Sequence, residues 1–433
     1  MYFRSYDHVV ALLRPILLSV LVLGSTTLQA GELLSVEVAV FEALVNNPSL
    51  AAIEARAEAL AAIPDQVGAL PDPRLSLKML NLPFDTLSFT QEGMTQLQVG
   101  YSQMLPYPGK LALRSQAATH EARAAKSEVA ERRLQLVRDV KMVWWNLFYL
   151  DRALEVVARN QMLLEQFVNV AETRYRVGRG LQQDILLAQL ERSKLNDTTL
   201  RLQNMRDNEV ARLNMLLSRP VETEAQLPVS VNEVLPTLMS LTALQQRAET
   251  TRPSLMVQSD RLGAARSRVD LAKKDYAPDF KVGLFYGLRN GDNPDGSDRS
   301  DLGSIIFSMN LPFDMSRKRS RAVDQRQAEW LAQKYQLEDL HNRVVTKVQQ
   351  AITDYRRAGE QAQLFQQEII PQAQQTVDAM LAGYQVGSVD FLNLVRSQTT
   401  LYNYETQYWK ALSSANQASA RLVAAVGEEK IYE

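Results

Sequence analysis

The chain has 433 residues, 46% of them hydrophobic, which is enough for a large core or for two or three domains of ordinary size. Its 48 Lys and Arg against 49 Asp and Glu give a formal net charge of -1; the basic excess typical of nucleic-acid-binding proteins is missing, and we expect no nucleic-acid partner. The chain has no Cys, which excludes disulfides, Cys–zinc sites, a thiol nucleophile and a lipid on an N-terminal Cys.

Residues 1–30 are predicted to be a secretory signal peptide. Arg4 and Arg14 give a positive start, an apolar stretch runs from Ile16 to Leu23, and small and polar residues lead to an expected cleavage point after Ala30. A transmembrane anchor is the alternative, but the apolar run is well short of the roughly 20 residues that a spanning helix needs. We therefore expect a mature chain that leaves the cytoplasm and has no membrane helix.

Four short motifs occur twice, in the same order and at a nearly constant offset of about half the chain. The pairs are Asn47–Leu50 with Arg252–Leu255, Leu70–Asp72 with Ala277–Asp279, Met104–Tyr107 with Asn310–Phe313, and Tyr175–Gly178 with Tyr384–Gly387. One such match would be chance, but four in order indicate a duplicated unit. The first copy is expected to cover residues 31–230 and the second residues 231–433, in one large domain with a duplicated core.

Each copy is predicted to begin with an Ala-rich helical segment, at about 36–67 and 241–275, and to continue with two short strands. The strands show clean alternation of apolar and polar side chains, as in Leu75, Leu77 and Met79 of the first strand. A period of two places each set on one face of a sheet. The other three strands are expected near 96–102, 280–288 and 304–311.

The alternating segments nearly fit a transmembrane strand, which needs roughly 9–11 residues with apolar side chains outward. A half-buried soluble sheet is the commoner origin of such a pattern, but here the strands are isolated inside an otherwise helical chain. Four strands cannot close a barrel, and open sheet edges are not tolerated in lipid. Membrane placement would therefore require several chains to share one barrel.

A very long helix is predicted to follow the strands in each copy, at about 109–175 and 315–384. Apolar residues recur from Leu136 to Val168 at alternating steps of four and three, the heptad pattern of a coiled coil. At 1.5 Å per residue the first of these helices would be about 100 Å long, which suits a tube better than a compact enzyme. Trp144 and Trp145 lie in this stretch and are expected to pack rather than to bind a ligand.

A glycine turn is predicted to join each long helix to a last helix, at about 184–217 and 390–425. Gly178 and Gly387 suit the left-handed residue that ends a helix. Asp184 and Asp390 then suit the N-cap of the next helix. Each turn should make an antiparallel helical hairpin whose tip lies far from the strands.

The sequence contains no catalytic constellation. His8 lies in the predicted signal peptide, while His120 and His341 are interpreted as isolated mid-helix residues. The Gly-x-Ser-x-Gly, His-Glu-x-x-His and P-loop patterns do not occur. The polar loop 290–298 has Gly291 where a calcium loop needs its first acid. We therefore expect no enzyme, no cofactor and no resident metal, and a passive protein whose energy comes from a partner.

With this order of elements, the chain resembles the TolC-type outer-membrane factors of Gram-negative bacteria over nearly its whole mature length. The strongest local match is Gly383–Gly387, which runs on to Thr399–Asn403. The Pro-Tyr-Pro-Gly-Lys run at 106–110 and the Asn-Leu-Pro-Phe-Asp run at 81–85 are most similar to the metal-efflux branch of that family.

The resemblance implies a mainly α fold with a membrane β-barrel portion and long coiled-coil helices that form a periplasmic tunnel. In a homotrimer, four strands per chain would contribute to a twelve-stranded barrel in the outer-membrane lipid. The implied function is the outer-membrane channel of a tripartite efflux system, an exit duct for metal ions or drugs. A periplasmic adaptor and an inner-membrane pump, of RND type, would deliver them. The alternatives are type I protein secretion on the same fold, and a periplasmic helical scaffold without a pore.

The resemblance also assigns roles at the hairpin tips. Tyr384 matches a gate tyrosine, Asp184 an acid that holds the gate closed, and Asp390 an acid of the pore ring. Asn393 stands where a second ring acid is expected, and the arginine that pairs with the gate acid has no counterpart. N-capping alone would also explain both aspartates, and the two roles are compatible. The residues expected to contact the adaptor are Gly178, Arg179, Gly180, Gly387 and Ser388.

Overall fold

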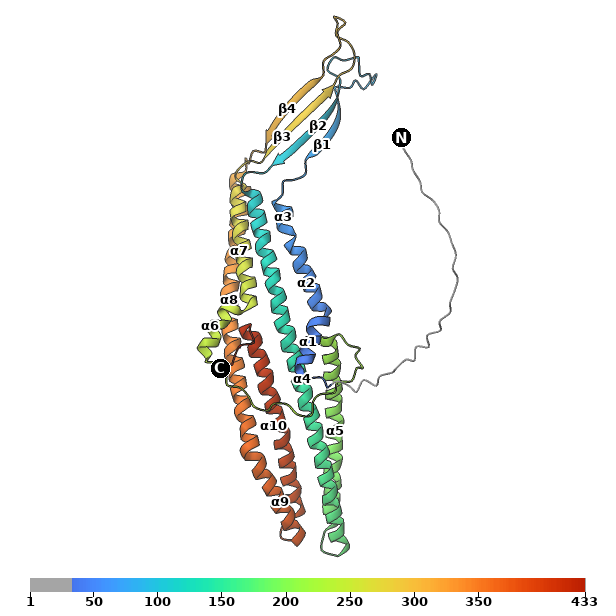
Figure 1. The fold of residues 1–433 in the computed structure, drawn as a ribbon, viewed down its shortest axis with the longest axis vertical. Coiled ribbons are helices and arrows are strands. Elements are labelled where there is room, and N and C mark those ends of the chain that lie inside the picture. The colour runs from blue at the N-terminus through green and yellow to red at the C-terminus, as the bar shows by residue number, and fades with distance from the viewer. Residues whose placement is uncertain (1–32, 433) are drawn as a thin grey trace, which may run out of the picture.

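Figure 1 shows the computed structural model, an elongated chain with its strands at one end and its helical hairpin tips at the other. The structure describes residues 33–432, so the predicted signal peptide lies outside the described residues. The first copy contains α1 (Val36–Asn46), α2 (Pro48–Ala61), α3 (Ile63–Gly68), β1 (Arg74–Leu80), β2 (Gln96–Leu105), α4 (Lys110–Arg176) and α5 (Gln182–Leu217).

The second copy follows the same order. It contains α6 (Leu241–Thr251), α7 (Pro253–Lys274), β3 (Phe280–Leu288), β4 (Leu302–Met309), η1 (Met315–Arg319), α8 (Ser320–Leu364), η2 (Phe365–Ile369), α9 (Ile370–Val386) and α10 (Phe391–Val426). The long helical segment predicted at 315–384 is confirmed as one continuous helical run, Met315–Val386, in which the π-helical turns η1 and η2 interrupt the α-helical hydrogen bonding but not the helix. Pro371 explains the second interruption: it has no N–H to donate to the carbonyl four residues earlier, and a wider turn accommodates it.

The four strands form one antiparallel sheet in the order β1-β2-β3-β4, so the central pair β2–β3 joins the two copies. The alternation predicted from the sequence is observed. One face carries large apolar side chains that are exposed in the single chain, including Leu75 at 74% and Ile305 at 79%. Within residues 33–432, β1 and β4 each pair with one neighbour only, and the sheet therefore has two open edges.

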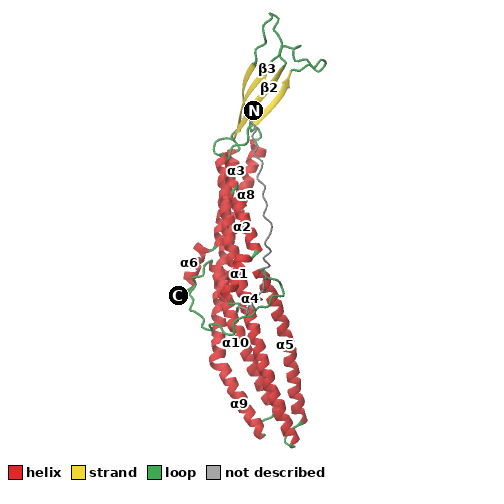
Figure 2. Cartoon of the chain, turned by 45° about the vertical axis from the view of Figure 1, so that its right-hand side comes forward, coloured by secondary structure: helices red, strands yellow, loops and turns green. Residues whose placement is uncertain are grey.

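The long helix α4 packs against α5, α7 and α10. Figure 2 shows α5 beside the lower part of the bundle, at the end away from the strands. Its predicted heptad residues are mostly buried, with Val140, Leu147 and Leu150 at 0% exposure. Trp144 is also buried, and its indole N–H donates a hydrogen bond of 2.8 Å to the Leu34 carbonyl. Both observations confirm packing as the role of this stretch.

The segment between α5 and α6 crosses the outside of the bundle at mid-height and ties the two copies together (Figure 1). The hydroxyls of Tyr355 and Tyr408 donate to Pro236 O and to the Glu233 carboxylate in this segment. The N–H of Met239 donates to Ile431 O at 3.0 Å. Among the described residues no single helix is both long and apolar enough to cross a membrane. The bent helix pair Val36–Asn46 and Pro48–Gly68 has the length and composition of a membrane span, and nothing else marks it as one.

Candidate functional site

Two helical hairpins meet at the end of the molecule farthest from the sheet. The first hairpin is α4–α5 and the second is α9–α10 (Figure 1). As predicted, Gly178 and Gly387 adopt left-handed backbone, with φ of 70° and 82°. In the second hairpin Gly387 N–H donates to Tyr384 O and Ser388 N–H to Gly383 O, a pair of bonds that closes a helix end. The first hairpin repeats this pair, so the two turns are built in the same way.

Tyr384 lies between the hairpins and is only 3% exposed. Its ring packs against Phe391 with centroids 5.0 Å apart, and its hydroxyl donates a 3.2 Å hydrogen bond to Asp184 of the first hairpin. Burial, and next the negative charge of Asp184, raise the pKa of Tyr384 to about 12. The tyrosine therefore remains a protonated donor to Asp184 at physiological pH.

Arg174 at the end of α4 covers the other side of this tyrosine. Its guanidinium carbon lies 4.7 Å from the Tyr384 ring centroid, a cation–π contact. The same guanidinium donates to the Tyr384 carbonyl, and at 3.1 Å to the Arg179 carbonyl. The first hairpin thus contacts Tyr384 through its hydroxyl, its ring face and its backbone. We call Arg174, Asp184 and Tyr384 the tip cluster.

Arg174 is a contact residue of Tyr384 that the sequence did not predict. We expected no counterpart of the family's arginine that pairs with the gate acid. The structure places Arg174 of the first hairpin against the ring and the carbonyl of Tyr384. A local signal did exist: in the repeat, Arg174 aligns with Gly383, so the residue before the shared tyrosine changes from Arg to Gly.

The N-cap position predicted for Asp184 is wrong, and that predicted for Asp390 is confirmed. Helix α5 begins at Gln182 with Leu181 as N-cap, so Asp184 lies in the first turn, where its charge is favourable to the helix dipole. Its carboxylate is thereby directed to Tyr384 rather than to the backbone of α5. Asp390 does occupy the N-cap position of α10, but its side chain accepts no capping hydrogen bond.

The structure brings together only part of the predicted site. Arg179 and Gly387 lie beside Arg174, and the Ser388 hydroxyl donates to Gly383 O at 3.0 Å. Gly180 packs so tightly that an added Cβ would lie 2.9 Å from the Tyr175 nitrogen. Gly178 is exposed at its turn. Asp390 and Asn393 lie apart from the tip cluster on the exposed start of α10.

The interpretation of the two helical histidines as isolated is also wrong. His120 Nδ1 lies 3.0 Å from an Asp260 carboxylate oxygen, and His341 Nε2 lies 3.7 Å from Glu249. Both contacts join neighbouring helices of the upper bundle. Within the part of the chain that the structure describes, no three His, Asp or Glu side chains are arranged to hold a metal ion.

Comparison with known proteins identifies similar chains. The family described as outer membrane efflux protein matches residues 39–219 and 244–428. Outer membrane protein TolC of Escherichia coli (strain K12) is 26% identical over 227 residues, which are 50% of this chain and 45% of TolC, so the match covers less than half of that relative.

A second relative is matched over most of its length. The cobalt-zinc-cadmium resistance protein CzcC of Cupriavidus metallidurans is 22% identical over 366 residues, 82% of this chain and 81% of CzcC. Among solved structures, the outer membrane protein VceC of Vibrio cholerae has a TM-score of 0.75 at 19% identity and covers 91% of this chain and 96% of that chain. At this identity the likeness to VceC establishes the fold, which agrees with the predicted architecture.

Proposed function

The chain belongs to the outer membrane efflux protein family, a family of transport conduits and not of enzymes, and we propose that it is the outer-membrane channel of a tripartite efflux system. In this role it is a passive exit duct that crosses the periplasm. The predicted TolC-like resemblance and non-enzymatic class agree with this family. What the duct carries and what it binds are the parts that we propose.

The sheet is the observation that carries the proposal. It presents an exposed apolar face and two open edges at the end of a helical bundle whose longest helix, α4, has 67 residues, or about 100 Å. Unpaired strand edges in lipid would leave backbone N–H and C=O groups without partners, at a cost of several kcal/mol each. Three chains joined edge to edge between β4 and β1 give a closed barrel of twelve strands and remove every open edge.

Divalent metal cations are the substrate class that we propose. CzcC, by its name a cobalt-zinc-cadmium resistance protein, matches most of the chain, whereas the TolC match covers half of it. Asp390 is exposed at the tip, where a trimer would gather three copies, and a ring of carboxylates favours cations. Type I protein secretion on the same fold is the second candidate that the sequence resemblance allows.

The tip cluster is proposed to be the gate. Arg174 and Asp184 of the first hairpin hold Tyr384 of the second, so the hairpins can separate only when these contacts break. Asp390 and Asn393 would line the pore beyond it. The exposed turns at Gly178–Gly180 and Gly387–Ser388 would face a periplasmic adaptor, with an RND-type pump supplying the energy.

Purification and planar-bilayer recording test the duct. We expect a detergent-stable trimer that forms ion-conducting pores, and a deletion strain that becomes more sensitive to zinc, cobalt or cadmium. A protein that fractionates as a periplasmic monomer would refute the duct and favour the helical scaffold. A deletion strain with normal metal tolerance and a defect in protein secretion would favour the second candidate.

A further inference from the structure

A groove of about 390 Å³ lies at mid-height between α4, α8 and α10, where the first residues of α7 reach the end of α10. Its lining is unusually cationic for so small a space. The basic residues are Arg138, Arg252, Lys347 and Arg421. Two acids also line it, Asp139 and Asp354, and each already pairs with an arginine, Arg138 and Arg421 respectively.

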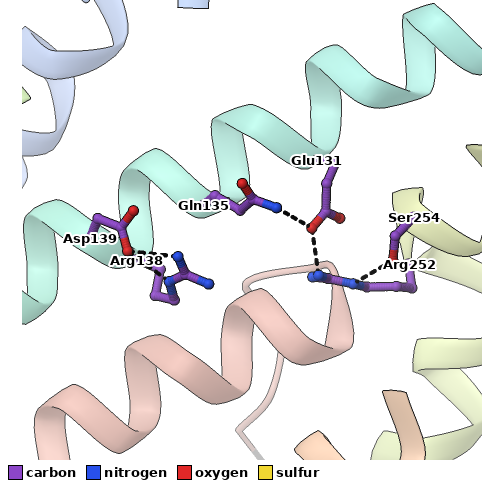
Figure 3. A network of polar contacts seen from close by, with 6 residues as sticks. All are labelled: Glu131, Gln135, Arg138, Asp139, Arg252 and Ser254. Carbon is purple, nitrogen blue, oxygen red and sulfur yellow. Dashed lines mark hydrogen bonds and ion pairs between the residues drawn. The ribbon is translucent and has the colours of Figure 1, made fainter. Parts of the chain in front are cut away.

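Arg252 is the buried member of this set. Its side chain is only 8% exposed, and it bridges from the start of α7 to Glu131 of α4 at 2.6 Å (Figure 3). Its Nε donates to the Ser254 hydroxyl at 3.1 Å. Within residues 33–432 its third nitrogen group, Nη1, is buried and finds no hydrogen-bond partner. A buried, unpartnered guanidinium nitrogen is costly, and such a group usually has a partner.

Figure 3 shows the guanidinium groups of Arg138 and Arg252 beside α4, with Arg138 bound to Asp139 and Arg252 to Glu131. Its Nε and Nη2 both donate to Asp139, at 2.8 and 2.7 Å. Burial lowers the pKa of Arg252, and the positive charge of Arg138 lowers it further, against the opposing effect of Glu131. Each of these two arginines is paired with one carboxylate, and the four basic residues of the groove stand against three paired acids, Asp139, Asp354 and Glu131.

Lys347 on α8 adds a further positive charge from the opposite wall. It lines the groove and makes no ion pair with any residue that the structure describes. It is the one basic residue of this lining that the described part of the chain leaves without a carboxylate partner.

The position equivalent to Arg252 in the first copy carries a different type of side chain. Asn47 occupies the equivalent position in the first copy, where its side chain caps α2 by accepting from the N–H groups of Ser49 and Leu50. Arg252 caps nothing with its side chain, although α7 begins in the same way with Pro253. Where the first copy has the helix cap Asn47, the second copy therefore has the buried positive charge of Arg252 beside the groove.

We propose that this groove binds a small oxyanion with two or more negative charges, held between Arg138 and Lys347 with Arg252 behind it. Phosphate-like oxygens suit the guanidinium groups of this lining, because arginine donates in a planar fork that matches such oxygens. The site belongs to the single chain. It therefore does not depend on the transported solute or on the pump.

The test uses the purified full-length protein in detergent, with inorganic phosphate as the probe and chloride at matched ionic strength and pH as the reference. We expect calorimetric titration to give one phosphate per chain and phosphate to raise the melting temperature, because a ligand of the folded state stabilises it. Arg138→Gln and Lys347→Gln should each weaken phosphate binding at least tenfold. Arg252 stays intact, since its removal would strand Glu131.

Lys141→Gln is the matched control. It removes one positive charge from α4, one turn from Arg138, but lines a different groove beside α1. We expect it to bind phosphate as the unmodified protein does. The site is refuted if phosphate stabilises the protein no more than chloride does, or if all three variants lose the same small part of the effect, which would mean general charge screening.

Discussion

Tyr175 and Tyr384 occupy equivalent positions in the two copies of the repeat, yet Tyr175 is 47% exposed and Tyr384 is 3% exposed. The turns that follow them are built alike, so the backbone does not cause the difference. Arg174, which precedes Tyr175, reaches over and covers Tyr384, whereas the glycine before Tyr384 has no side chain to return the contact. Because of this one difference between the duplicated motifs, the first hairpin covers the tyrosine of the second, and the second does not cover the tyrosine of the first.

Replacing Tyr384 by Phe should loosen the proposed gate. The change removes the hydroxyl that donates to Asp184 but keeps the ring against Phe391. One such hydrogen bond contributes about 1 kcal/mol, so the open fraction should rise roughly fivefold. Single-channel recording in planar bilayers measures it. Tyr175→Phe is the control and should leave the open fraction unchanged; an equal effect of both variants would remove Tyr384 from the gate.

Replacing Arg174 by Ala should have a larger effect. It removes the cation–π contact and the donor to the Tyr384 carbonyl together, for a combined loss of about 2–3 kcal/mol. We expect a channel that is open most of the time, and a strain that takes up large antibiotics more readily. Arg176→Ala removes an exposed arginine of the same turn and should behave as the unmodified protein. A closed Arg174→Ala channel would contradict the assignment.

Alkaline pH should open the same gate. Tyr384 has a pKa of about 12 in the fold against about 10 when unfolded. Because the folded value is the higher one, the stabilisation is complete below pH 10 and is lost as the pH rises through 12. Bilayer conductance recorded from pH 8 to 12 should therefore rise at the upper end. The Tyr384→Phe channel should lack this rise, and a rise that persists in it would point to another group.

Replacing Asp390 by Asn should reduce the preference of the pore for cations. Its carboxylate is exposed at the start of α10 and caps no backbone group, so its charge is available to the pore. Reversal potentials under a salt gradient measure the change. Asn393→Asp should shift the reversal potential in the opposite direction, and Asp197→Asn on α5 should not shift it. Unchanged selectivity in both tip variants would exclude these positions from the pore lining.

Replacing Lys110 by Met should weaken the junction between sheet and bundle. Lys110 is 2% exposed and its ammonium group lies 3.0 Å from Asp275 and 2.9 Å from Asp279. Loss of these charged bonds should cost about 2 kcal/mol, seen as a lower melting temperature. Lys273→Met removes an exposed lysine near the same corner and should change the melting temperature little.

The same junction should weaken in acid. Burial pushes the pKa of Asp279 upward, but the Tyr107 N–H and Lys110 outweigh it and hold the pKa below its usual value. A lowered value means that the stabilisation is present at neutral pH and is lost as the pH falls below about 4. Lys110→Met should reduce this acid sensitivity. Acid sensitivity equal to that of the unmodified protein would show that other carboxylates dominate.

The strands and the long helix could be predicted because each keeps one face in an apolar environment along its whole length, so its apolar side chains recur at a regular spacing. In β1 that face carries Leu75, Leu77 and Met79, and in α4 it carries the heptad residues. The contact between Arg174 and Tyr384 joins residues 210 positions apart, and no local pattern encodes such a pair. The prediction of Asp184 as an N-cap failed for a different reason. Gln182 and Gln183 are good helix formers, so α5 begins at Gln182, before Asp184.

The π-helical segment η2 acts as a phase correction in the second long helix. Phe365, Val377 and Tyr384 are all buried, but Val377 comes twelve residues after Phe365, whereas three α-helical turns take about eleven. The wide π-helical turn holds the extra residue, so the side chains of α9 that follow it keep the same direction around the helix axis as in a regular α-helix. Deleting one residue from η2 would therefore convert the wide turn into a regular α-helical turn and keep the hydroxyl of Tyr384 directed to Asp184. Deleting one residue from a regular turn of α9 would instead rotate the residues below it by about 100° and turn that hydroxyl away, although no residue of the tip had changed.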